Sequence, residues 1–575
     1  MQLDAAALAS LSRVPGFPSR TAPFPPAPAP TLAPLPSFWT AHYTSPFQDT
    51  GATDPLPDEA DVVVIGSGLT GVSAVDELVR LHLASSSSEH THEEERPTLR
   101  IVVLEARTFC SGATGRNGGH LTAYPIARFG TLCARWGVDE AKRAVRLEEE
   151  GVRWVLDGCE TEGWAEDVEL RSGKGTLVMF DTPEQVHEVE AQLALAAESG
   201  EDVGQARWVS SADAMETYGA KTFRALVVPG NTLYPLKLVT KLFGRASSRI
   251  EQVAATAAAG RRSPVSLDLF THCLVDAVER SPDLRPASQP TWLVRTARGT
   301  IRTSHVLHAT NAYASHALPS LASPSFSAGQ ILPTRSQMLE LVPSTPPKRE
   351  EAWDNAFSSE NAPRNSTYFF QRAVKESQEG GGEGNVQGGE ILIGGMRERV
   401  PGMEWGVADD GALNPVVGNA LRGAVGEMFP SRYGHEGEGL RVGMEWTGIL
   451  GYREEGNPMV GPVYINGEKQ DGQWIAAGYS GHGMPRAPLC AHLVASLIYH
   501  QLSQSAAASA SLPSPPFQLP AYFPRHLLST SDGVGRPDTR LDEEGEVEGG
   551  WLWVRRESVR AEEMRQQGAS RCESA

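Results

Sequence analysis

The chain has 575 residues, of which 40% are hydrophobic and 21% charged, and its formal net charge is −19. A single hydrophobic core stops growing near ~250–300 residues, so we expect more than one domain. The negative charge argues against binding to nucleic acid or to an anionic membrane surface, and no apolar run approaches the ~20 residues of a membrane span.

The two ends of the chain have compositions that cannot build a packed core. Residues 1–57 include a proline-rich stretch, and we expect this N-terminal segment to be disordered, with Phe38 and Trp39, which interrupt it, as candidates for docking on the folded body. Residues 521–575 include an acidic run, and we expect a mostly disordered tail there. The six cysteines are widely spaced without a Cys-x-x-Cys pair, which favours a reduced, cytoplasmic protein, and we expect no metal site.

The first folded unit is expected to begin at Asp61–Ile65, a run of valine and isoleucine typical of a strand buried on both faces of a parallel sheet. Val72–Leu81 carries apolar residues at helical spacing, and Arg100–Leu104 repeats the buried-strand pattern. Strand, helix and strand in this order predict a βαβ unit in a Rossmann-like α/β domain.

The turn between the first strand and the helix has the pattern G-x-G-x-x-G. Its residues are Gly66, Ser67, Gly68, Leu69, Thr70 and Gly71. Glycines permit a tight turn and a close approach of backbone to a pyrophosphate, and the helix N-terminus presents free N–H groups to that anion. Glu105 ends the second strand and is the expected acceptor for ribose hydroxyls. A polar insertion before Pro97 explains why Glu105 stands further from Gly66 than the usual ~20 residues. This unit alone does not distinguish NAD from FAD.

A second glycine-rich segment follows Glu105 and reads SGATGRNGGH over residues 111–120. Further along, Leu233–Val239 reads LYPLKLV, Val306–Ala309 leads into TNAY, and residues 478–484 read GYSGHGM. These motifs, in this order, resemble the D-amino-acid oxidase/glycine oxidase (DAO) family of FAD-dependent oxidoreductases over about Asp61 to Leu502. The resemblance implies that the cofactor is FAD.

The resemblance also implies cofactor contacts at several of these motifs. Besides the first glycine turn and Glu105, the matching positions are Ala106, Arg107, Gly112, Ala113, Thr114, Arg116, Asn117, Gly118, Gly119, His120, Val275, Thr310, Asn311, Gly478, Gly481, His482, Gly483 and Met484. Arg116 is expected near the flavin or its phosphates. Val275, in an expected strand Thr271–Val275, is expected on the adenine side. We expect FAD to be bound without a covalent link; His120 or Cys110 would be the attachment point if such a link exists.

The segment from Glu445 to Arg453 departs from the family pattern. In the family, an arginine shortly after a W-x-G strand binds the substrate carboxylate, whereas this chain has Ile449 or Leu450 at the matching place. A bidentate carboxylate clamp needs a guanidinium in a fixed position, so an amine without that carboxylate becomes a more favoured substrate. The candidates for a catalytic role are His482, Tyr452 and Arg453.

Two domains are implied by the resemblance. The FAD-binding domain is expected to comprise residues 58–125, 225–320 and 440–505. A second α+β domain, built on an antiparallel sheet, is expected to comprise residues 126–224 and 321–439. A hairpin of Tyr368–Arg372 with Ile391–Gly395 is expected in that sheet, and a small amine or amino acid would lie between the sheet and the flavin.

The expected reaction is oxidation of a C–N bond to an imine, with oxygen as the electron acceptor. Two alternatives stay open: a flavin dehydrogenase that uses another acceptor, and a catalytically silent DAO-like binding or regulatory module. A nicotinamide dehydrogenase is a weaker possibility. The sequence gives no indication of the oligomeric state.

Overall fold

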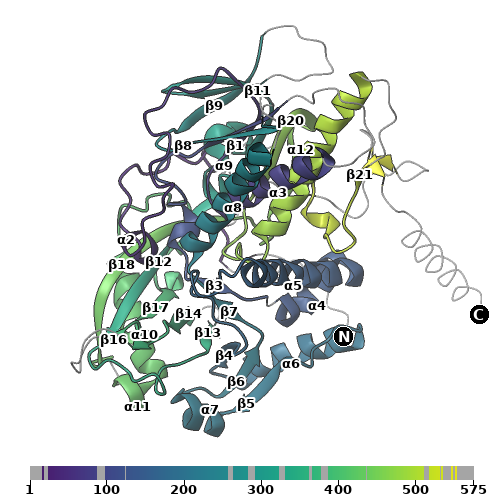
Figure 1. Ribbon diagram of the computed structural model, residues 1–575. Coiled ribbons are helices and arrows are strands. Elements are labelled where there is room, and N and C mark those ends of the chain that lie inside the picture. The colour runs from purple at the N-terminus through teal and green to yellow at the C-terminus, as the bar shows by residue number, and fades with distance from the viewer. Residues whose placement is uncertain are drawn as a thin grey trace, which may run out of the picture.

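The computed structural model describes residues 14, 16–18, 24–86, 98–123, 125–256, 263–282, 292–322, 330–361, 365–376, 386–434, 437–509, 517–530, 533–534, 546–547 and 551–552. Two sheets, each with eight strands, organise these residues (Figure 1). The sheets lie in different parts of the molecule, and the helices cover their faces.

The first sheet is the expected Rossmann-like one. Its main path runs β19 (Met459–Ile465), β20 (Glu468–Ala477), β11 (Gly299–His308), β1 (Glu59–Ile65), β2 (Leu99–Leu104) and β8 (Val265–Phe270), with β9 (Val275–Arg280) and β10 (Trp292–Thr296) branching from β11. The pairs from β20 through β8 are parallel. Val62, Val63 and Val64 are fully buried, as expected for a strand covered on both faces.

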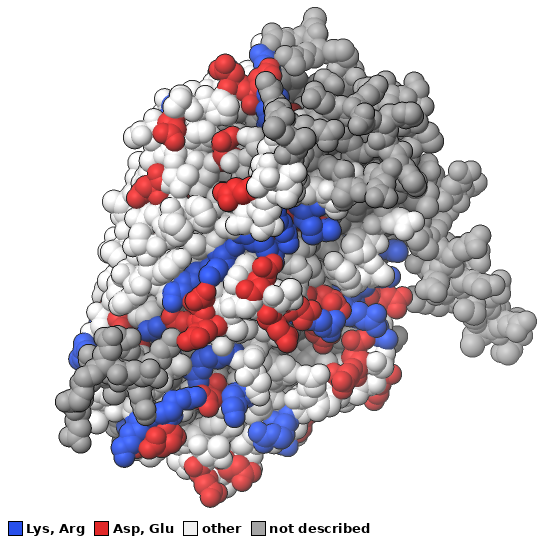
Figure 2. Space-filling model, in the orientation of Figure 1, with Lys and Arg blue, Asp and Glu red and all other residues white. Residues whose placement is uncertain are grey.

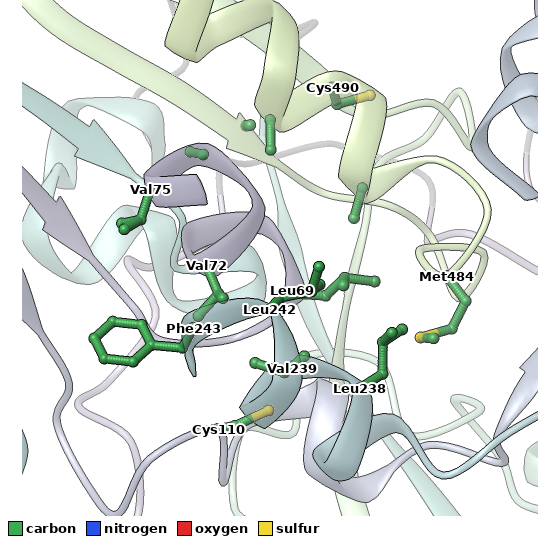
Figure 3. Packing of buried hydrophobic residues seen from close by; sticks show 14 of the residues in the cluster. Leu69, Val72, Val75, Cys110, Leu238, Val239, Leu242, Phe243, Met484 and Cys490 are labelled. Atoms are coloured by element: carbon green, nitrogen blue, oxygen red, sulfur yellow. The ribbon is translucent and has the colours of Figure 1, made fainter. Parts of the chain in front are cut away.

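Three helices pack together on one side of the first sheet. They are α3 (Leu69–Ser86), α8 (Pro235–Thr256) and α12 (Ala487–Ser509). Figure 3 shows Leu69 and Val72 of α3 beside Leu242 and Phe243 of α8, with Cys490 of α12 nearby. This apolar contact fixes the N-terminus of α3, and therefore the glycine turn that precedes it.

The second sheet runs β18 (Leu440–Tyr452), β12 (Leu332–Pro343), β17 (Ile391–Gly395), β14 (Asn365–Gln371), β13 (Ala356–Asn361), β4 (Thr176–Phe180), β6 (Arg224–Val228) and β5 (Arg207–Ser210). Only the β13–β4 pair among these neighbours is parallel. The expected hairpin forms, because β14 pairs with β17 in antiparallel register. The side chains of β14 alternate: Phe369 packs toward α10 (Pro415–Met428), whereas Tyr368 and Phe370 lie against His120 on the other face.

The remaining elements connect the two sheets or cover them. The helices are α2 (Phe38–Ala41), α4 (Phe129–Trp136), α5 (Val138–Thr161), α6 (Pro183–Glu198), α7 (Ser211–Tyr218), α9 (Ala314–Ala317) and α11 (Pro430–Tyr433). Two-residue strands occur at β3 (His120–Leu121), β7 (Asn231–Thr232), β15 (Lys375–Glu376), β16 (Val386–Gln387), β21 (Phe517–Gln518), β22 (Ser529–Thr530), β23 (Gly533–Val534), β24 (Glu546–Val547) and β25 (Trp551–Leu552).

Both chain ends differ from the sequence expectation. Residues 24–57 are packed: Phe38 and Trp39 are fully buried, and Ser37 caps α2. Near the other end, Phe523, Leu527 and Leu528 belong to the main core. The expectation of disorder failed here because burial against distant segments, which composition does not reveal, stabilises these residues. Most of the expected tail, from residue 535 onward, lies outside the described residues.

Two strand expectations also need correction. β18 belongs to the second sheet through its pairing with β12, although residues 440–505 were expected in the FAD-binding domain. The expected strand Thr271–Val275 is a turn up to residue 274, and only Val275 begins β9. His272 has a φ of 50°, a left-handed conformation that interrupts a strand.

Charges of both signs share the surface in Figure 2, where the blue and red side chains lie beside one another. Lys237 pairs with Glu169, and Lys241 with Asp167. The net negative charge is therefore not gathered into a single acidic field on this face. Among the described residues, no helix is both long and apolar enough to cross a membrane.

Candidate active site

A long cavity opens at the carboxyl ends of the parallel strands β1, β2 and β11. Ile65, Leu104 and Ala309, at or just after these strand ends, line it. Its volume, counted as the space open to the centre of a water molecule, is about 200 Å³. This edge of an open parallel sheet is where α/β proteins bind nucleotides.

Most of the sequence-predicted cofactor residues line this cavity. They are Gly66, Gly68, Leu69, Thr70, Glu105, Ala106, Arg107, Gly112, Ala113, Thr114, Asn117, Val275, Thr310, Asn311, Gly481, Gly483 and Met484. They come from segments far apart in the sequence, and the fold brings them together. The remaining expected residues act in other ways, as described below.

The glycine turn is shaped by close backbone contacts. Gly66 has a φ of 108°, and a Cβ there would lie 2.7 Å from the carbonyl oxygen of Ala309. A Cβ on Gly71 would lie 1.9 Å from the carbonyl oxygen of Gly66, so the third glycine lets α3 approach the strand end. These tight contacts leave the start of α3 pointing at the cavity, where its free N–H groups suit a phosphate.

The carboxylate of Glu105 is held in a fixed position at the end of β2. Its Oε2 accepts hydrogen bonds from the backbone N and the Oγ of Ser67, at 3.1 and 2.8 Å, and its Oε1 accepts one from the backbone N of Arg107, at 3.0 Å. Ser67 does not line the cavity. It orients the carboxylate that does, while backbone from Cys273 pairs with Glu105 on the side of Val275.

The cavity has the donors and acceptors that a dinucleotide requires. Thr310 Oγ1 is buried, lines the cavity and has no hydrogen-bond partner among the described residues. Thr114 Oγ1 accepts from the backbone N of Leu69 at the first turn of α3. Gly112 has open space where a Cβ would stand. A buried polar atom without a partner indicates a ligand group, and we conclude that these residues fit FAD.

An N-terminal strap, residues 24–35, covers one side of the cavity. Pro30 lines the cavity directly. The strap is fixed along its length: Ala27 N donates to Ser315 Oγ at 2.9 Å, and Thr31 Oγ1 donates to Asp409 Oδ1 at 2.9 Å. The expected disordered segment therefore forms part of the site.

A buried ion cluster anchors the strap. Arg107 Nη1 lies 2.9 Å from Asp410 Oδ2 and donates to the carbonyl oxygen of Thr31 at 3.2 Å. Arg116 Nε lies 3.3 Å from the same Asp410 oxygen and donates to the carbonyl oxygen of Thr447 at 2.7 Å. Burial lowers the pKa of Arg116 to about 10 against the opposing effect of Asp410. Arg116 was expected near the flavin or its phosphates, but it does not line the cavity. Its side chain instead connects the glycine-rich loop to β18.

Gly118, Gly119 and His120 connect the glycine-rich loop to the second sheet. A Cβ on Gly118 would lie 2.5 Å from the ring of Tyr368. The His120 ring meets Tyr368 and Phe370 edge-on, with centroids 5.6 and 5.7 Å away. Burial lowers the pKa of His120 to about 4, so its imidazole is neutral at pH 7.

The residues of the turn from Gly478 to Met484 face in two directions, some toward the cavity and His482, which is partly exposed, toward α5. Gly481, Gly483 and Met484 line the cavity, whereas the His482 Nε2 lies 2.9 Å from Glu148 Oε2 on α5. Glu148 also accepts from Arg486 Nε at 2.7 Å. Burial raises the pKa of Glu148, but the charges of Arg486 and His482 outweigh it and lower the pKa to about 2. The His482 side chain therefore connects this turn to α5, and the geometry does not favour the catalytic role expected for it.

The two other catalytic candidates differ from each other. Arg453 is fully buried, and its Nη1 donates to the carbonyl oxygens of Asn457 and Pro458 at 2.8 and 3.3 Å. Its guanidinium thus holds a loop, and the geometry does not favour a substrate contact. Tyr452 remains beside the cavity: its hydroxyl lies 2.7 Å from where a Cβ on Gly481 would be.

Several cavity residues were missed by sequence reasoning. They are Pro30, Leu274, Ala312, Tyr313, His316, Ala317, Tyr479 and Ala487. Ala312 and Tyr313 are the last two residues of the TNAY motif, and His316 follows it by three residues, so extending the predicted contacts along that motif would have found them. Pro30 and the anchor Asp410 carry no local signal, because their roles depend on contacts across the whole chain.

Comparisons with known proteins identify a family with this architecture. The family model described as "DAO: FAD dependent oxidoreductase" matches residues 61–497. The gamma-glutamylputrescine oxidoreductase of Escherichia coli (strain K12) is 26% identical over 465 residues, which cover 80% of this chain and 87% of the relative.

Solved structures have the same fold. Glycine oxidase from Geobacillus kaustophilus superposes with a TM-score of 0.52 at 17% identity, covering 77% of this chain and 95% of that one. L-proline dehydrogenase from P. horikoshii gives 0.52 at 19% identity, covering 77% and 94%. L-amino acid deaminase from Proteus myxofaciens gives 0.53 at 13% identity, covering 79% and 92%. The family match and the nucleotide cavity confirm the resemblance stated from the motifs: the chain belongs to the DAO family of FAD-dependent oxidoreductases.

Proposed function

We propose that the protein oxidises the C–N bond of a small amine or amino acid to an imine and passes the electrons to oxygen. The observation that carries this proposal is the course of the cavity, which begins at the glycine turn and Glu105 and ends against β18 and the Gly481 turn. A dinucleotide held at one end would present its reactive ring near the second sheet.

FAD, when bound, supplies the acceptor for the hydride that leaves the carbon next to the nitrogen. The residues of the protein would bind and orient the cofactor and shield it from water. Glu105 and the start of α3 would bind the ribose and pyrophosphate, and the strap would exclude water from one side. Neutral His120 and the aromatic rings of Tyr368 and Tyr452 would form the wall on the substrate side. We name no general base.

Two observations support the proposed substrate class: the name of one relative, and the residues at the substrate side of the cavity. One relative is named for gamma-glutamylputrescine, and we propose a primary or secondary amine of that general kind as the first compound to assay. The absence of arginine at Ile449 and Leu450 supports an amine over an ordinary α-amino acid. We further propose that the first sheet and its helices form the FAD-binding domain, and that the second sheet forms the substrate domain.

The test is a visible absorption spectrum of the purified protein, before and after acid precipitation, followed by an amine screen in an oxygen electrode with peroxide detection. Flavin released into the supernatant, and oxygen uptake with an amine, are the expected results. Turnover with an artificial acceptor but no oxygen uptake would replace the oxidase by a dehydrogenase. A colourless protein that FAD cannot reconstitute would overturn the proposal.

A cytoplasmic location remains a further proposal. It is supported by the described cysteines, Cys110, Cys133, Cys159, Cys273 and Cys490, all of which are free thiols. Cell fractionation of the tagged protein tests it.

A further inference from the structure

Arg397 lies over two aromatic rings, those of Trp405 and Tyr452, and the Tyr452 hydroxyl borders the cavity at Gly481. Its guanidinium carbon lies 4.2 Å from the ring centre of Trp405 and 4.4 Å from that of Tyr452. The two rings meet edge-on, with centroids 5.0 Å apart. Stacking on ring faces fixes the plane of a guanidinium and leaves its N–H groups free to donate at the edge.

The N–H groups of this cluster lack acceptors. Arg397 Nη1 and Trp405 Nε1 are both buried, and neither has a hydrogen-bond partner among the described residues. Two other enclosed arginines of the second sheet and the cavity are paired with acids: Arg107 with Asp410, and Arg335 with Glu404. Arg397 has no such pair in the described part of the chain. Two buried donors without partners and one positive charge without an acid beside it fit an anionic acceptor such as a carboxylate.

The cluster adjoins the two glycine turns at the end of the cavity. The Tyr452 hydroxyl lies against Gly481, and the Tyr368 ring lies against Gly118. Arg397 and Tyr452 are both close enough to Tyr368 to act electrostatically on it. A ligand held by Arg397 would therefore lie between the second sheet and the segment that lines the cavity at Gly481.

The backbone before Arg397 is built for this placement. Gly395 has a φ of 117°, and a Cβ there would lie 1.9 Å from the carbonyl oxygen of Ser366. Met396 has a φ of 60°, a left-handed conformation that is unfavourable for a residue with a side chain. Such strain is concentrated at functional sites, where the surrounding structure maintains it. Here it turns the chain off β17 and directs the next side chain toward Trp405.

We infer that Arg397, with the indole N–H of Trp405, binds a carboxylate group of the amine substrate and so selects amines that also carry a carboxylate. The inference rests on the proposed function, because it names the part of the substrate that the wall recognises. β18 has Ile449 and Leu450 where an arginine that binds the substrate carboxylate was expected. The inference assigns that role to Arg397, just after the end of β17. Arg397 is thus a specificity-determining residue.

The experiment compares the wild-type holoenzyme with Arg397→Met and Trp405→Phe. Isothermal titration with butanoate, together with the visible flavin spectrum, measures carboxylate binding. Assays with putrescine and with gamma-glutamylputrescine measure the preference for a carboxylated amine. We expect Arg397→Met to weaken butanoate binding and to lower kcat/KM for the carboxylated amine by about 10- to 100-fold, with little change for putrescine. Trp405→Phe keeps the ring and loses the donor, so a smaller loss of the same kind is expected.

Arg432→Met is the matched control. Arg432 stacks on Trp353 at 4.5 Å, in the core on the other face of the second sheet, and its replacement should leave butanoate binding unchanged. Equal losses for both amines in Arg397→Met, or wild-type protein that neither binds butanoate nor prefers the carboxylated amine, would overturn the inference. If no amine is oxidised but butanoate binding still depends on Arg397, the proposed function fails and the anion site stands. If Arg397→Met does not fold, Arg397→Lys and Trp405→Phe decide.

Discussion

The Oδ2 atom of Asp410 lies 2.9 Å from the Nη1 atom of Arg107, and both side chains are buried. Arg107 follows β2 of the first sheet, whereas Asp410 lies in the segment between β17 of the second sheet and α10. The same carboxylate also faces Arg116. One acid therefore joins the cofactor cavity, the N-terminal strap and β18.

Replacing Asp410 should destabilise the folded protein and weaken the retention of FAD. Asp410→Asn leaves two buried guanidinium groups without their carboxylate, and loss of one partner from a buried pair costs about 3–5 kcal/mol. We expect a lower melting temperature and faster loss of FAD, measured by circular dichroism and flavin fluorescence during heating. Asp409→Asn is the control, because Asp409 is an exposed neighbour whose side-chain hydrogen bonds, within the described ranges, go to the strap residue Thr31 and to Gly411. Equal effects in the two variants would contradict the importance of the ion cluster.

Two glycine substitutions should separate folding from cofactor binding. Gly71→Ala places a Cβ 1.9 Å from the Gly66 carbonyl oxygen, so we expect about 1–3 kcal/mol of destabilisation with or without FAD. Gly112→Ala meets no atom of the protein within 4 Å but points its methyl group into the region lined by the cavity residues. Apoprotein stability should stay unchanged while FAD affinity falls, as measured by thermal melts and flavin titration. Destabilised Gly112→Ala apoprotein would refute this assignment.

The acid stability of the protein should depend on Glu148. Its pKa of about 2 lies below the ordinary value of 4.5, so the carboxylate contributes stability that is present above about pH 4.5 and is lost as the pH falls toward 2. The contribution is about 3 kcal/mol. Melting temperatures measured between pH 7 and pH 3 should fall less steeply in Glu148→Gln than in the wild type, and Glu148→Gln should be the less stable protein at pH 7. Parallel curves for the two proteins would show that Glu148 is not responsible.

Arg453→Met should act on stability and leave substrate recognition intact. The change removes the donor from the carbonyl oxygens of Asn457 and Pro458, at about 1–3 kcal/mol for each carbonyl left without a partner. We expect a lower melting temperature with the KM for amine changed by less than about twofold in the surviving holoenzyme, since a pure stability effect does not enter KM. A stable variant with a strongly raised KM would restore Arg453 as a substrate-binding residue.

The parts of the fold that follow from local pattern were predictable. The strand Asp61–Ile65 lies within β1, Arg100–Leu104 lies within β2, and the helix after the glycine turn is α3. Continuous apolar runs and fixed glycine spacing carry that information within a few residues. The hairpin of β14 and β17 was predictable for the same reason, since its strands are short apolar runs separated by a polar, glycine-rich loop.

The side-chain directions were not predictable. Gly481 and Gly483 face the cavity while His482, between them, reaches Glu148 on α5. Arg116 and Arg453 look like ligand-binding residues in sequence, yet both donate to main-chain carbonyls within the protein. Arg397 gave no motif at all. The partners of His482 and Arg116 lie hundreds of residues away, and Arg397 follows a single left-handed residue, so none of these three leaves a local pattern. The partners of Arg453 are close in sequence, but a carbonyl that accepts from a guanidinium leaves no residue-type signal.

The N-terminal strap has a consequence for biosynthesis. It leaves the ribosome early in synthesis, but Thr31 meets Asp409, 378 residues further on. During that interval the strap lacks its anchors at Asp409 and Asp410, although Arg107 and Ser315, which also hold it, are made earlier. Proline suits a segment that must wait, because it removes backbone donors and prevents pairing with exposed sheet edges. Full enclosure of the flavin is therefore a late event of maturation, because a nascent chain that ends before residue 409 lacks both acidic anchors of the strap.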